Sequence, residues 1–345
     1  MSPSQNTLTG VLMETDEEVH MANVRIEEKP REYVYIWRNI ILYIALHLSS
    51  LYAIYLIFSS AKLLTTVQVF ILTNLGVLGV TCGAHRLWSH RSYKAKAPLK
   101  IILVIIETLA FQFSVIRWAR DHRVHHRYTD TDADPYNAKR SLFFAHAGWV
   151  LTEKHPDVVA KTKAVDISDL TNDPLLRFQY EYYASLTVLI AFFLPIVIPV
   201  YLWGETFQNA WFLNWLRICL NMNFISLINS AAHYYGGKPY DRYINPSENL
   251  SVAVLALGEG WHNYHHTFPW DYKASELGKY SLNWSTAFID FFAKIGWAYD
   301  LKVVSTDVIK KRMLRTGDGT HQVEGWTDKN ISEEDIQDTI VSKNN

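Results

Sequence analysis

Histidine is the residue type whose number and spacing indicate chemistry in this chain. Fourteen histidines are present, and nine of them fall in four short motifs. These motifs are His85-Arg-Leu-Trp-Ser-His90, His122-Arg-Val-His125-His126, Asn229-Ser-Ala-Ala-His233 and His262-Asn-Tyr-His265-His266. In each triplet the histidines occupy positions i, i+3 and i+4, so three imidazoles share one side of a helix. His85 and His90 are five residues apart, about 140° around an α-helix, and converge only if the helix ends between them.

Nine imidazoles exceed what one metal ion accepts, so the motifs predict two ions. Without a shared partner, so many buried rings would leave donors or acceptors unpaired. A metal ion binds one nitrogen of each neutral ring while the other nitrogen donates a hydrogen bond. The carboxylates expected to accept those bonds are Asp121, Asp130, Asp132, Asp134 and Glu259. Imidazole suits zinc, copper, iron and nickel alike, which leaves the metal open, although structural zinc fits this cysteine-free set poorly.

The other five histidines, the two cysteines and the net charge indicate no further site or partner. His20, His47, His146, His155 and His321 lie outside the motifs and are read as satisfied polar residues. Cys82 and Cys219 are isolated in apolar runs, which excludes a disulfide scaffold and a paired-cysteine zinc site. The net charge of −1 gives no reason to expect a nucleic acid partner.

Four apolar stretches have the length, about 20 residues, that a helix needs to cross a bilayer. They cover residues 40–60, 67–84, 184–203 and 211–232. Lys and Arg concentrate in residues 24–38, 85–183 and 234–315, which the positive-inside tendency places in the cytosol. We therefore predict an all-α integral membrane protein with four transmembrane helices in two hairpins. A cytosolic helical cap would hold the histidine-rich two-metal site.

A fifth apolar stretch, residues 99–116, is expected to form a helix in the interface or under the cap. If it crossed the membrane once, the histidine motifs before and after it would lie on opposite faces. A true fifth span remains the alternative, because short apolar runs are ambiguous. Residues 1–35 are predicted to form a polar cytosolic segment, 36–315 the membrane domain, and 316–345 a mobile cytosolic tail.

The motifs HRLWSH, WARDHRVHH, NSAAH and GEGWHNYHH, in this order and with these spans between them, resemble the membrane acyl-CoA desaturases. The similarity is greatest to the stearoyl-CoA desaturase type and its insect relatives, including those of moths, and it runs from about Tyr33 to His321. It implies an O₂-dependent di-iron enzyme of the endoplasmic reticulum membrane with both termini in the cytosol. The implied product is a double bond of the Δ9 or Δ11 type in a long-chain acyl-CoA, for fatty acid or pheromone biosynthesis. The implied partners are cytochrome b5, NADH-cytochrome b5 reductase and membrane lipid.

The resemblance also implies roles for individual residues. One Fe²⁺ would be held by His85, His126, His233 and His266. The other would be held by His90, His122, His125, His262 and His265, and Asn229 would reach one metal through water. Asn39, Arg120, Asp121 and Lys154 would contact the CoA portion, and Trp118 would flank the acyl tunnel. Phe113, Glu153 and Ser226 depart from the vertebrate pattern, so head-group contacts and tunnel shape are expected to differ from it.

Two further expectations concern the reaction. Thr73 and Val77, before His85 in the second span, are candidates for the closed end of the tunnel, whose depth would select the reacting carbon. Arg123, Arg127 and Lys139 are candidates for docking an acidic electron donor.

Two other functions fit the same residues: a fatty acyl hydroxylase or acetylenase on the same scaffold, and a non-enzymatic metal-binding membrane protein. A transporter would need ionisable residues near the bilayer midplane, whereas these histidines lie at the ends of the spans.

Overall fold

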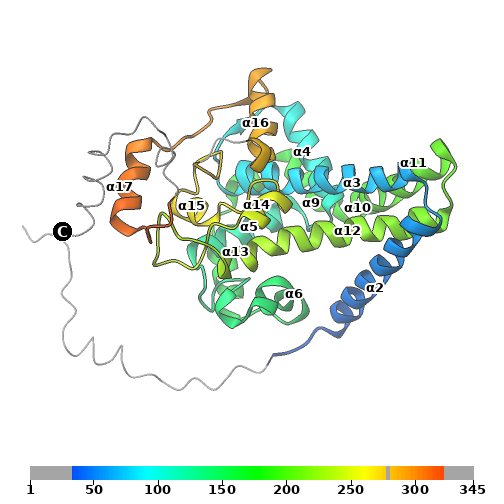
Figure 1. The fold of residues 1–345 in the computed structure, drawn as a ribbon, viewed down its shortest axis with the longest axis horizontal. Coiled ribbons are helices and arrows are strands. Elements are labelled where there is room, and N and C mark those ends of the chain that lie inside the picture. Colours follow the sequence, from blue (N-terminus) through cyan, green and yellow to red (C-terminus); the bar gives the residue numbers. More distant parts are fainter. Residues whose placement is uncertain (1–32, 277–279, 322–345) are drawn as a thin grey trace, which may run out of the picture.

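The structure, a computed structural model, describes residues 33–276 and 280–321, and long helices dominate it (Figure 1). Three continuous helical segments are long and apolar enough to cross a membrane: Trp37–Ser59, Leu63–Ser89 and Tyr183–Trp203. The first is helix α2, and the second joins α3 (Leu63–Leu78) to the π-helix η1 (Gly79–Ser89). The third joins α10 (Tyr183–Thr187), the π-helix η4 (Val188–Phe193) and α11 (Leu194–Trp203). Three of the four predicted spans therefore reappear, with ends shifted by a few residues.

The fourth predicted span is helix α12 (Phe207–Asn229), which is long enough but less apolar. Several of its polar side chains donate hydrogen bonds inside the bundle, although Asn221 Oδ1 is buried without a partner among the described residues. Arg217 Nη1 donates to Leu109 O at 2.6 Å and Nη2 donates to Ala191 O at 2.8 Å. Asn221 Nδ2 donates to Thr73 O at 3.2 Å. These bonds tie α12 to three neighbouring helices and offset the cost of burying polar groups.

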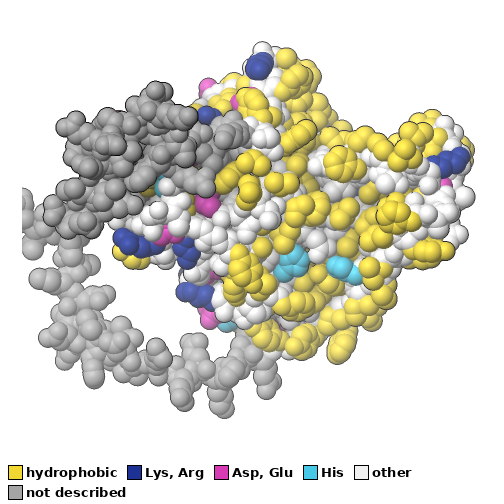
Figure 2. Space-filling model, in the orientation of Figure 1, with side chains coloured by type: hydrophobic (Ala, Val, Ile, Leu, Met, Phe, Trp, Pro, Cys, Tyr) yellow, Lys and Arg dark blue, Asp and Glu magenta, His cyan; other side chains and the backbone are white. Residues whose placement is uncertain are grey.

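The two helical hairpins are joined at their turns. Glu205, in the turn between α11 and α12, accepts hydrogen bonds from Lys62 N at 2.8 Å and Thr65 Oγ1 at 2.6 Å. Lys62 lies in the turn after α2, and Thr65 lies in the first turn of α3. The outward faces of the hairpins are apolar, as Phe58 illustrates with 86% exposure, and hydrophobic side chains cover much of the surface in Figure 2. A surface of this kind is suited to lipid.

The apolar stretch at 99–116 is two helices rather than the single helix we predicted. Helix α4 (Ala97–Ala110) and helix α5 (Val115–Arg127) meet at a bend of 81°. The break lies at Phe111 and Phe113, whose φ angles are 60° and 69°. Helix α4 packs closely on η1, since a Cβ at Gly79 would lie 2.3 Å from Glu107 N. The bend brings α5 and its histidines beside η1, and whether this pair crosses the membrane stays a prediction.

Shorter elements form the cap around the histidines. Strand β1 (Lys94–Ala95) pairs antiparallel with β2 (Ala298–Tyr299), with Lys94 opposite Tyr299. The short helices are α6 (Trp149–Leu151), α7 (Pro156–Ala164), α8 (Ser168–Thr171), α9 (Pro174–Glu181), α13 (Ala231–Tyr234), α14 (Leu250–Leu255), α15 (His262–Thr267), α16 (Trp284–Lys294), α17 (Thr306–Thr316), η2 (Ala138–Arg140), η3 (Phe144–Gly148) and η5 (Tyr280–Leu282). The largest buried apolar cluster packs α4, η1 and α16 together.

The predicted tail begins inside the described part of the chain. Thr316 Oγ1 donates to Tyr240 O at 2.6 Å, and Asp318 N donates to Lys238 O at 3.1 Å. Residues 316–321 therefore pack along the loop that precedes α14. The rest of the predicted tail, and residues 1–32 of the predicted polar segment, lie outside the described residues.

Candidate metal centre

The nine motif histidines converge into two neighbouring groups of nitrogen atoms. The first group contains His85, His90, His122, His126 and His265, and the second contains His125, His233, His262 and His266. Within each group the candidate ligand atoms all lie within 4.8 Å of one another. The groups adjoin, because the rings of His126 and His266 stack with centroids 4.1 Å apart. The motifs thus assemble as predicted into a nine-histidine, two-group arrangement.

The expected division of the ligands between two ions is wrong for four histidines. His85 and His126 were assigned with His233 and His266, but they lie in the other group. His125 and His262 are exchanged in the opposite sense. The reason is helical geometry: residues i and i+4 differ by about 40° around a helix, whereas i+3 and i+4 differ by about 100°. The i, i+4 pairs therefore stay together, and His125 and His265 each turn to the other group.

A π-helix brings His85 and His90 together. We expected their convergence to require a helix end between them, and η1 does end at Ser89, one residue before His90, although its last turns have the wider π form. His90 N donates to His85 O at 3.1 Å, and Ser89 Oγ donates to Ala84 O at 2.6 Å, both across five residues. In a π-helix, residues five apart are aligned, as i→i+5 bonding requires. The imidazole centroids of His85 and His90 are consequently 4.9 Å apart.

The contacts among the ring nitrogens fit bound cations better than hydrogen bonds. His265 Nε2 lies 2.9 Å from His85 Nε2 and 3.0 Å from His126 Nε2. His262 Nε2 lies 3.0 Å from His233 Nε2 and 3.1 Å from His266 Nε2. An imidazole nitrogen carries either one proton or one in-plane lone pair, so it cannot make two well-aligned hydrogen bonds at once. Converging lone pairs of this kind are the ligand set of a metal ion.

His125 supports the same conclusion from an isolated atom. Its Nε2 is buried and has no hydrogen-bond partner among the described residues, although its Nδ1 lies 2.9 Å from Asp134 Oδ1. An imidazole whose Nδ1–H is held by a carboxylate presents an unprotonated Nε2, which is the form that ligates metals. The residues therefore fit a two-metal centre.

Three of the five predicted carboxylates lie beside the histidines. Glu259 Oε2 lies 3.0 Å from His85 Nδ1, and Asp130 Oδ2 lies 3.5 Å from His233 Nδ1. Asp134 is the third, through His125. Of the other two, Asp121 pairs with Arg120 and Lys154, and Asp132 pairs with Arg140. The prediction thus holds for Glu259, Asp134 and Asp130, each of which lies within 3.5 Å of a histidine ring nitrogen. The sequence alone does not show which carboxylates reach a histidine.

The pKa values of the site follow from burial and from these carboxylates. Burial and the charges of neighbouring imidazoles lower the pKa values of His122 and His126 well below the usual range. Burial alone would lower the pKa of His125 too, but Asp134 and Asp130 raise it. Burial would raise the pKa of Glu259, but the charges of Arg86 and His85 outweigh it and lower that pKa. Most of the imidazoles are thus held in the neutral form that a metal requires.

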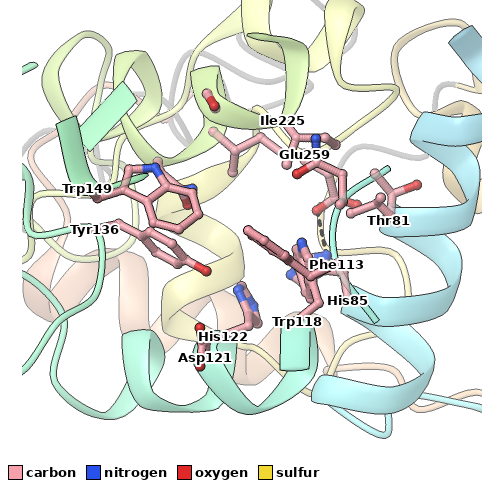
Figure 3. A pocket seen from close by; sticks show the side chains of 15 residues that line it. Thr81, His85, Phe113, Trp118, Asp121, His122, Tyr136, Trp149, Ile225 and Glu259 are labelled. Carbon is pink, nitrogen blue, oxygen red and sulfur yellow. Dashed lines mark ion pairs between the residues drawn. The ribbon is translucent and has the colours of Figure 1, made fainter. Parts of the chain in front are cut away.

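A cavity with a volume of about 640 Å³, including its opening, reaches the first histidine group. Figure 3 shows Tyr136 and Trp149 on one side of it and His85 and Phe113 on the other. The lining residues are Val80, Thr81, His85, Gln112, Phe113, Trp118, Asp121, His122, Tyr136, Trp149, Ile225, Ser226, Ile228, Asn229 and Glu259. Most of this wall is apolar or aromatic, which suits a hydrocarbon substrate.

The predicted substrate residues have mixed outcomes. Trp118 lines the cavity and stacks on His122 with centroids 4.8 Å apart. Arg120, Asp121 and Lys154 form one cluster: Asp121 lies 2.8 Å from Arg120 Nη2 and 2.7 Å from Lys154 Nζ. Asn39 stands apart from the cavity lining, and its Nδ2 donates to Val150 O at 2.7 Å.

The roles given to Thr73 and Val77 stay predictions, and the role given to Arg123 needs revision. Val80 and Thr81 line the cavity, and Val77 belongs to the same buried cluster as Val80. Arg123 was a candidate for donor docking, but its guanidinium is occupied by Asp169 and by Trp88 O at 2.7 Å. It fastens the first histidine motif to α5 instead.

The sequence reasoning missed several lining residues. Tyr136 and Trp149 come from a stretch between the histidine motifs that has no periodic pattern. Their rings contact each other edge to face at 4.8 Å, and Trp149 Nε1 is buried without a partner among the described residues. The one available signal was a large aromatic residue, Tyr136, two positions after Asp134, which holds His125.

Comparison with known proteins identifies the family. Residues 61–281 match the model of the fatty acid desaturase family. The chain is 53% identical to the acyl-CoA Delta-9 desaturase of Acheta domesticus, over 97% of this chain and 96% of that protein. It is 51% identical to the acyl-CoA Delta(11) desaturase of Choristoneura rosaceana, over 93% and 95% of the two chains. It is 48% identical to the acyl-CoA desaturase of Ovis aries, over 90% and 86%. The chain belongs to the fatty acid desaturase family, as its histidine motifs predicted.

Proposed function

We propose that this protein is an acyl-CoA desaturase that uses O₂ and two iron ions to remove two hydrogens from adjacent methylenes of a long acyl chain. The observation that carries the proposal is the meeting of an apolar cavity with the first histidine group at His85 and His122. Family membership and the printed activities of the relatives support it. A methylene has no group for a side chain to attack, so a buried metal centre beside the chain is what the reaction requires.

The nine histidines would hold the two irons, with Asn229 reaching one of them through water. Bound iron would supply the reduction of O₂ that drives removal of the two hydrogens. The protein would hold the ligands with Glu259, Asp130 and Asp134, and would position the chain against the aromatic wall. Exclusion of water by that wall protects the reaction from solvent.

The cluster of Arg120, Asp121 and Lys154 would bind the CoA portion at the entrance of the cavity. Arginine is suited to phosphate, and Asp121 fixes both cations in place. Asn39 would act indirectly, because its bond to Val150 O fastens the segment that leads to Lys154. The depth of the cavity beyond the histidines would then set which carbon is desaturated. The proposed position is Δ9 or Δ11, for fatty acid or pheromone biosynthesis, by analogy with relatives named Delta-9 and Delta(11) desaturases. Relatives named Delta-12 desaturases match about as well, so the names alone do not select the position.

The membrane arrangement follows from the same geometry. Helices α2, α3 with η1, α10 to α11, and α12 would cross the endoplasmic reticulum membrane, with both termini and the cap in the cytosol. Cytochrome b5 and its NADH-dependent reductase would supply electrons from the cytosolic side, where Arg127 and Lys139 are exposed.

The experiment is expression in a yeast strain that lacks its own desaturase, followed by location of double bonds in the lipids by mass spectrometry. We expect growth without added unsaturated fatty acid and a single predominant bond position. His125→Ala, which removes one candidate ligand, should abolish the product. A hydroxylated chain as the main product would overturn desaturation in favour of hydroxylation, and a fully active His125→Ala variant would overturn the metal centre.

A further inference from the structure

A cavity-lining phenylalanine in the turn between α4 and α5 stacks on an arginine of the first turn of α5. The guanidinium carbon of Arg117 lies 3.7 Å from the ring centroid of Phe113. Phe113 lines the cavity, so its ring is shared between the cavity and the arginine. Its φ angle of 69° is one that a bulky residue adopts at a cost. A strained residue at a cavity wall indicates a position selected for what it contacts.

The turn is held from both sides, so this pair is presented rigidly. Before the turn, Arg217 Nη1 donates to Leu109 O at 2.6 Å. After the turn, Gln179 Oε1 accepts from Val115 N at 2.9 Å, and Ser114 caps α5 by accepting from Arg117 N. Rigid support of this kind is typical of side chains that must be placed before a ligand arrives.

Arg117 shares a face of α5 with the charged cluster. Positions 117, 120 and 121 are related by i, i+3 and i+4, so Arg117, Arg120 and Asp121 lie along one stripe of the helix. Asp121 is paired with both Arg120 and Lys154. Among the described residues no carboxylate pairs with Arg117, and the recorded partner of its guanidinium is the Phe113 ring. Three cations and one carboxylate give these four residues a net charge of +2.

We propose that Arg117 binds a phosphate group in the CoA portion of the substrate, with its guanidinium stacked on the Phe113 ring. The proposal rests on the proposed function, since it assigns a contact to the same substrate. A half-buried guanidinium without a carboxylate partner is suited to bidentate binding of phosphate, and stacking on an aromatic ring fixes its plane. The Phe113 ring also forms cavity wall, so the same residue would align the head group with the acyl chain. Arg117 would then contribute to the affinity for acyl-CoA rather than to the rate of the reaction.

The test is the kinetics of Arg117→Gln with two substrates that carry the same acyl chain. One is the acyl-CoA, and the other is the acyl-N-acetylcysteamine thioester, which has no phosphate. With acyl-CoA we expect KM to rise about tenfold, as loss of a charged hydrogen bond does, with kcat within about twofold of the parent. With the phosphate-free thioester, KM should match that of the parent protein. Phe113→Leu, which removes the platform but keeps the charge, should raise KM for acyl-CoA about threefold.

Arg242→Gln is the matched control. Arg242 is an exposed arginine whose guanidinium lies 5.5 Å from the Tyr243 ring, away from the cavity lining. It should leave both KM values unchanged. Unchanged KM of Arg117→Gln for acyl-CoA, or an equal increase for both thioesters, would overturn the proposal, since either result removes the link to phosphate. If the parent protein converts neither thioester, the proposed function itself fails, which is a distinct outcome.

Discussion

At the level of single residues, Glu259 couples the metal centre to the interior of the cap. It is 1% exposed, and it contacts Arg86 Nη2 at 2.8 Å and His85 Nδ1 at 3.0 Å. Arg86, which belongs to the first histidine motif, also donates to Tyr272 O and Asn283 Oδ1, so its ion pair with Glu259 is anchored to the loop after α15 and to the residue that caps α16. Orientation of His85 therefore depends on a residue far from it in the sequence.

Replacing Glu259 with Gln should weaken metal binding, and it should also lower stability because it leaves the buried Arg86 without its carboxylate. The amide keeps the shape but loses the charge that holds the His85 Nδ1–H, and such changes typically cost about 10–100-fold in metal affinity. Titration of the metal-free protein with iron, followed by iron analysis, measures this. Asp132→Asn is the control, because Asp132 is 50% exposed and pairs with Arg140. Equal iron affinity in both variants would contradict the role given to Glu259.

Residue types and spacing predicted which side chains form the site, but not how the nine histidines divide between the two groups. The nine histidines came from motif composition, and the apolar cavity wall was expected from the membrane setting. The division into groups depends on ring directions that differ by about 100° between neighbouring helix positions. Tyr136 and Trp149 depend on the path of a loop, which no periodic pattern encodes. Pairings such as Asp121 with Lys154 depend on tertiary packing in the same way.

At the level of elements, two irregular segments set the geometry. The π-helix η1 aligns His85 with His90, and the bend between α4 and α5 places α5 beside η1. The apolar pattern of both stretches predicted helices, which is correct. It carried no signal for a π-helix or for a bend at Phe111, because bulky residues rarely adopt positive φ. Those features come from close packing, shown by Gly79 against the α4 backbone.

Helix α8 is tied to these elements through Asp169, and this tie should depend on pH. Partial burial would raise the pKa of Asp169, but hydrogen bonds from Arg123 and Arg91 lower it from 3.8 to about 2. A carboxyl with a lowered pKa in the folded state stabilises the protein above its ordinary pKa and loses that effect as pH falls toward 2.

We therefore expect Asp169→Asn to lower the Tm at pH 7 by about 1–3 °C, a small effect because the ion pairs are partly exposed. The difference between the two proteins should shrink as pH falls below about 4, where the parent carboxyl also becomes neutral in the unfolded chain. Thermal unfolding in detergent from pH 7 to pH 3 measures it. A difference that grows on acidification would contradict the assignment.

At the level of the whole molecule, the arrangement requires both hairpin turns on one side of the membrane and the cap on the other. The two native cysteines are buried, so single introduced cysteines report on sidedness with little background. In sealed microsomes, an impermeant maleimide should label Lys139→Cys on the cap directly. It should label Ser59→Cys, at the end of α2, only after permeabilisation. Labelling of both positions in intact vesicles would contradict the four-span topology.

The central claim is that two histidine-held irons and O₂ desaturate an acyl-CoA, and a single-turnover measurement tests it most directly. Protein loaded with Fe²⁺, given acyl-CoA and O₂ without any reductant, has only the electrons of its own iron. Reduction of O₂ to water takes two electrons from the two broken C–H bonds and two from the iron pair. The expected result is one double bond per two ferrous ions, in proportion to the iron bound, and none with zinc. Double bonds formed by iron-free protein, or a yield unrelated to bound iron, would contradict the account.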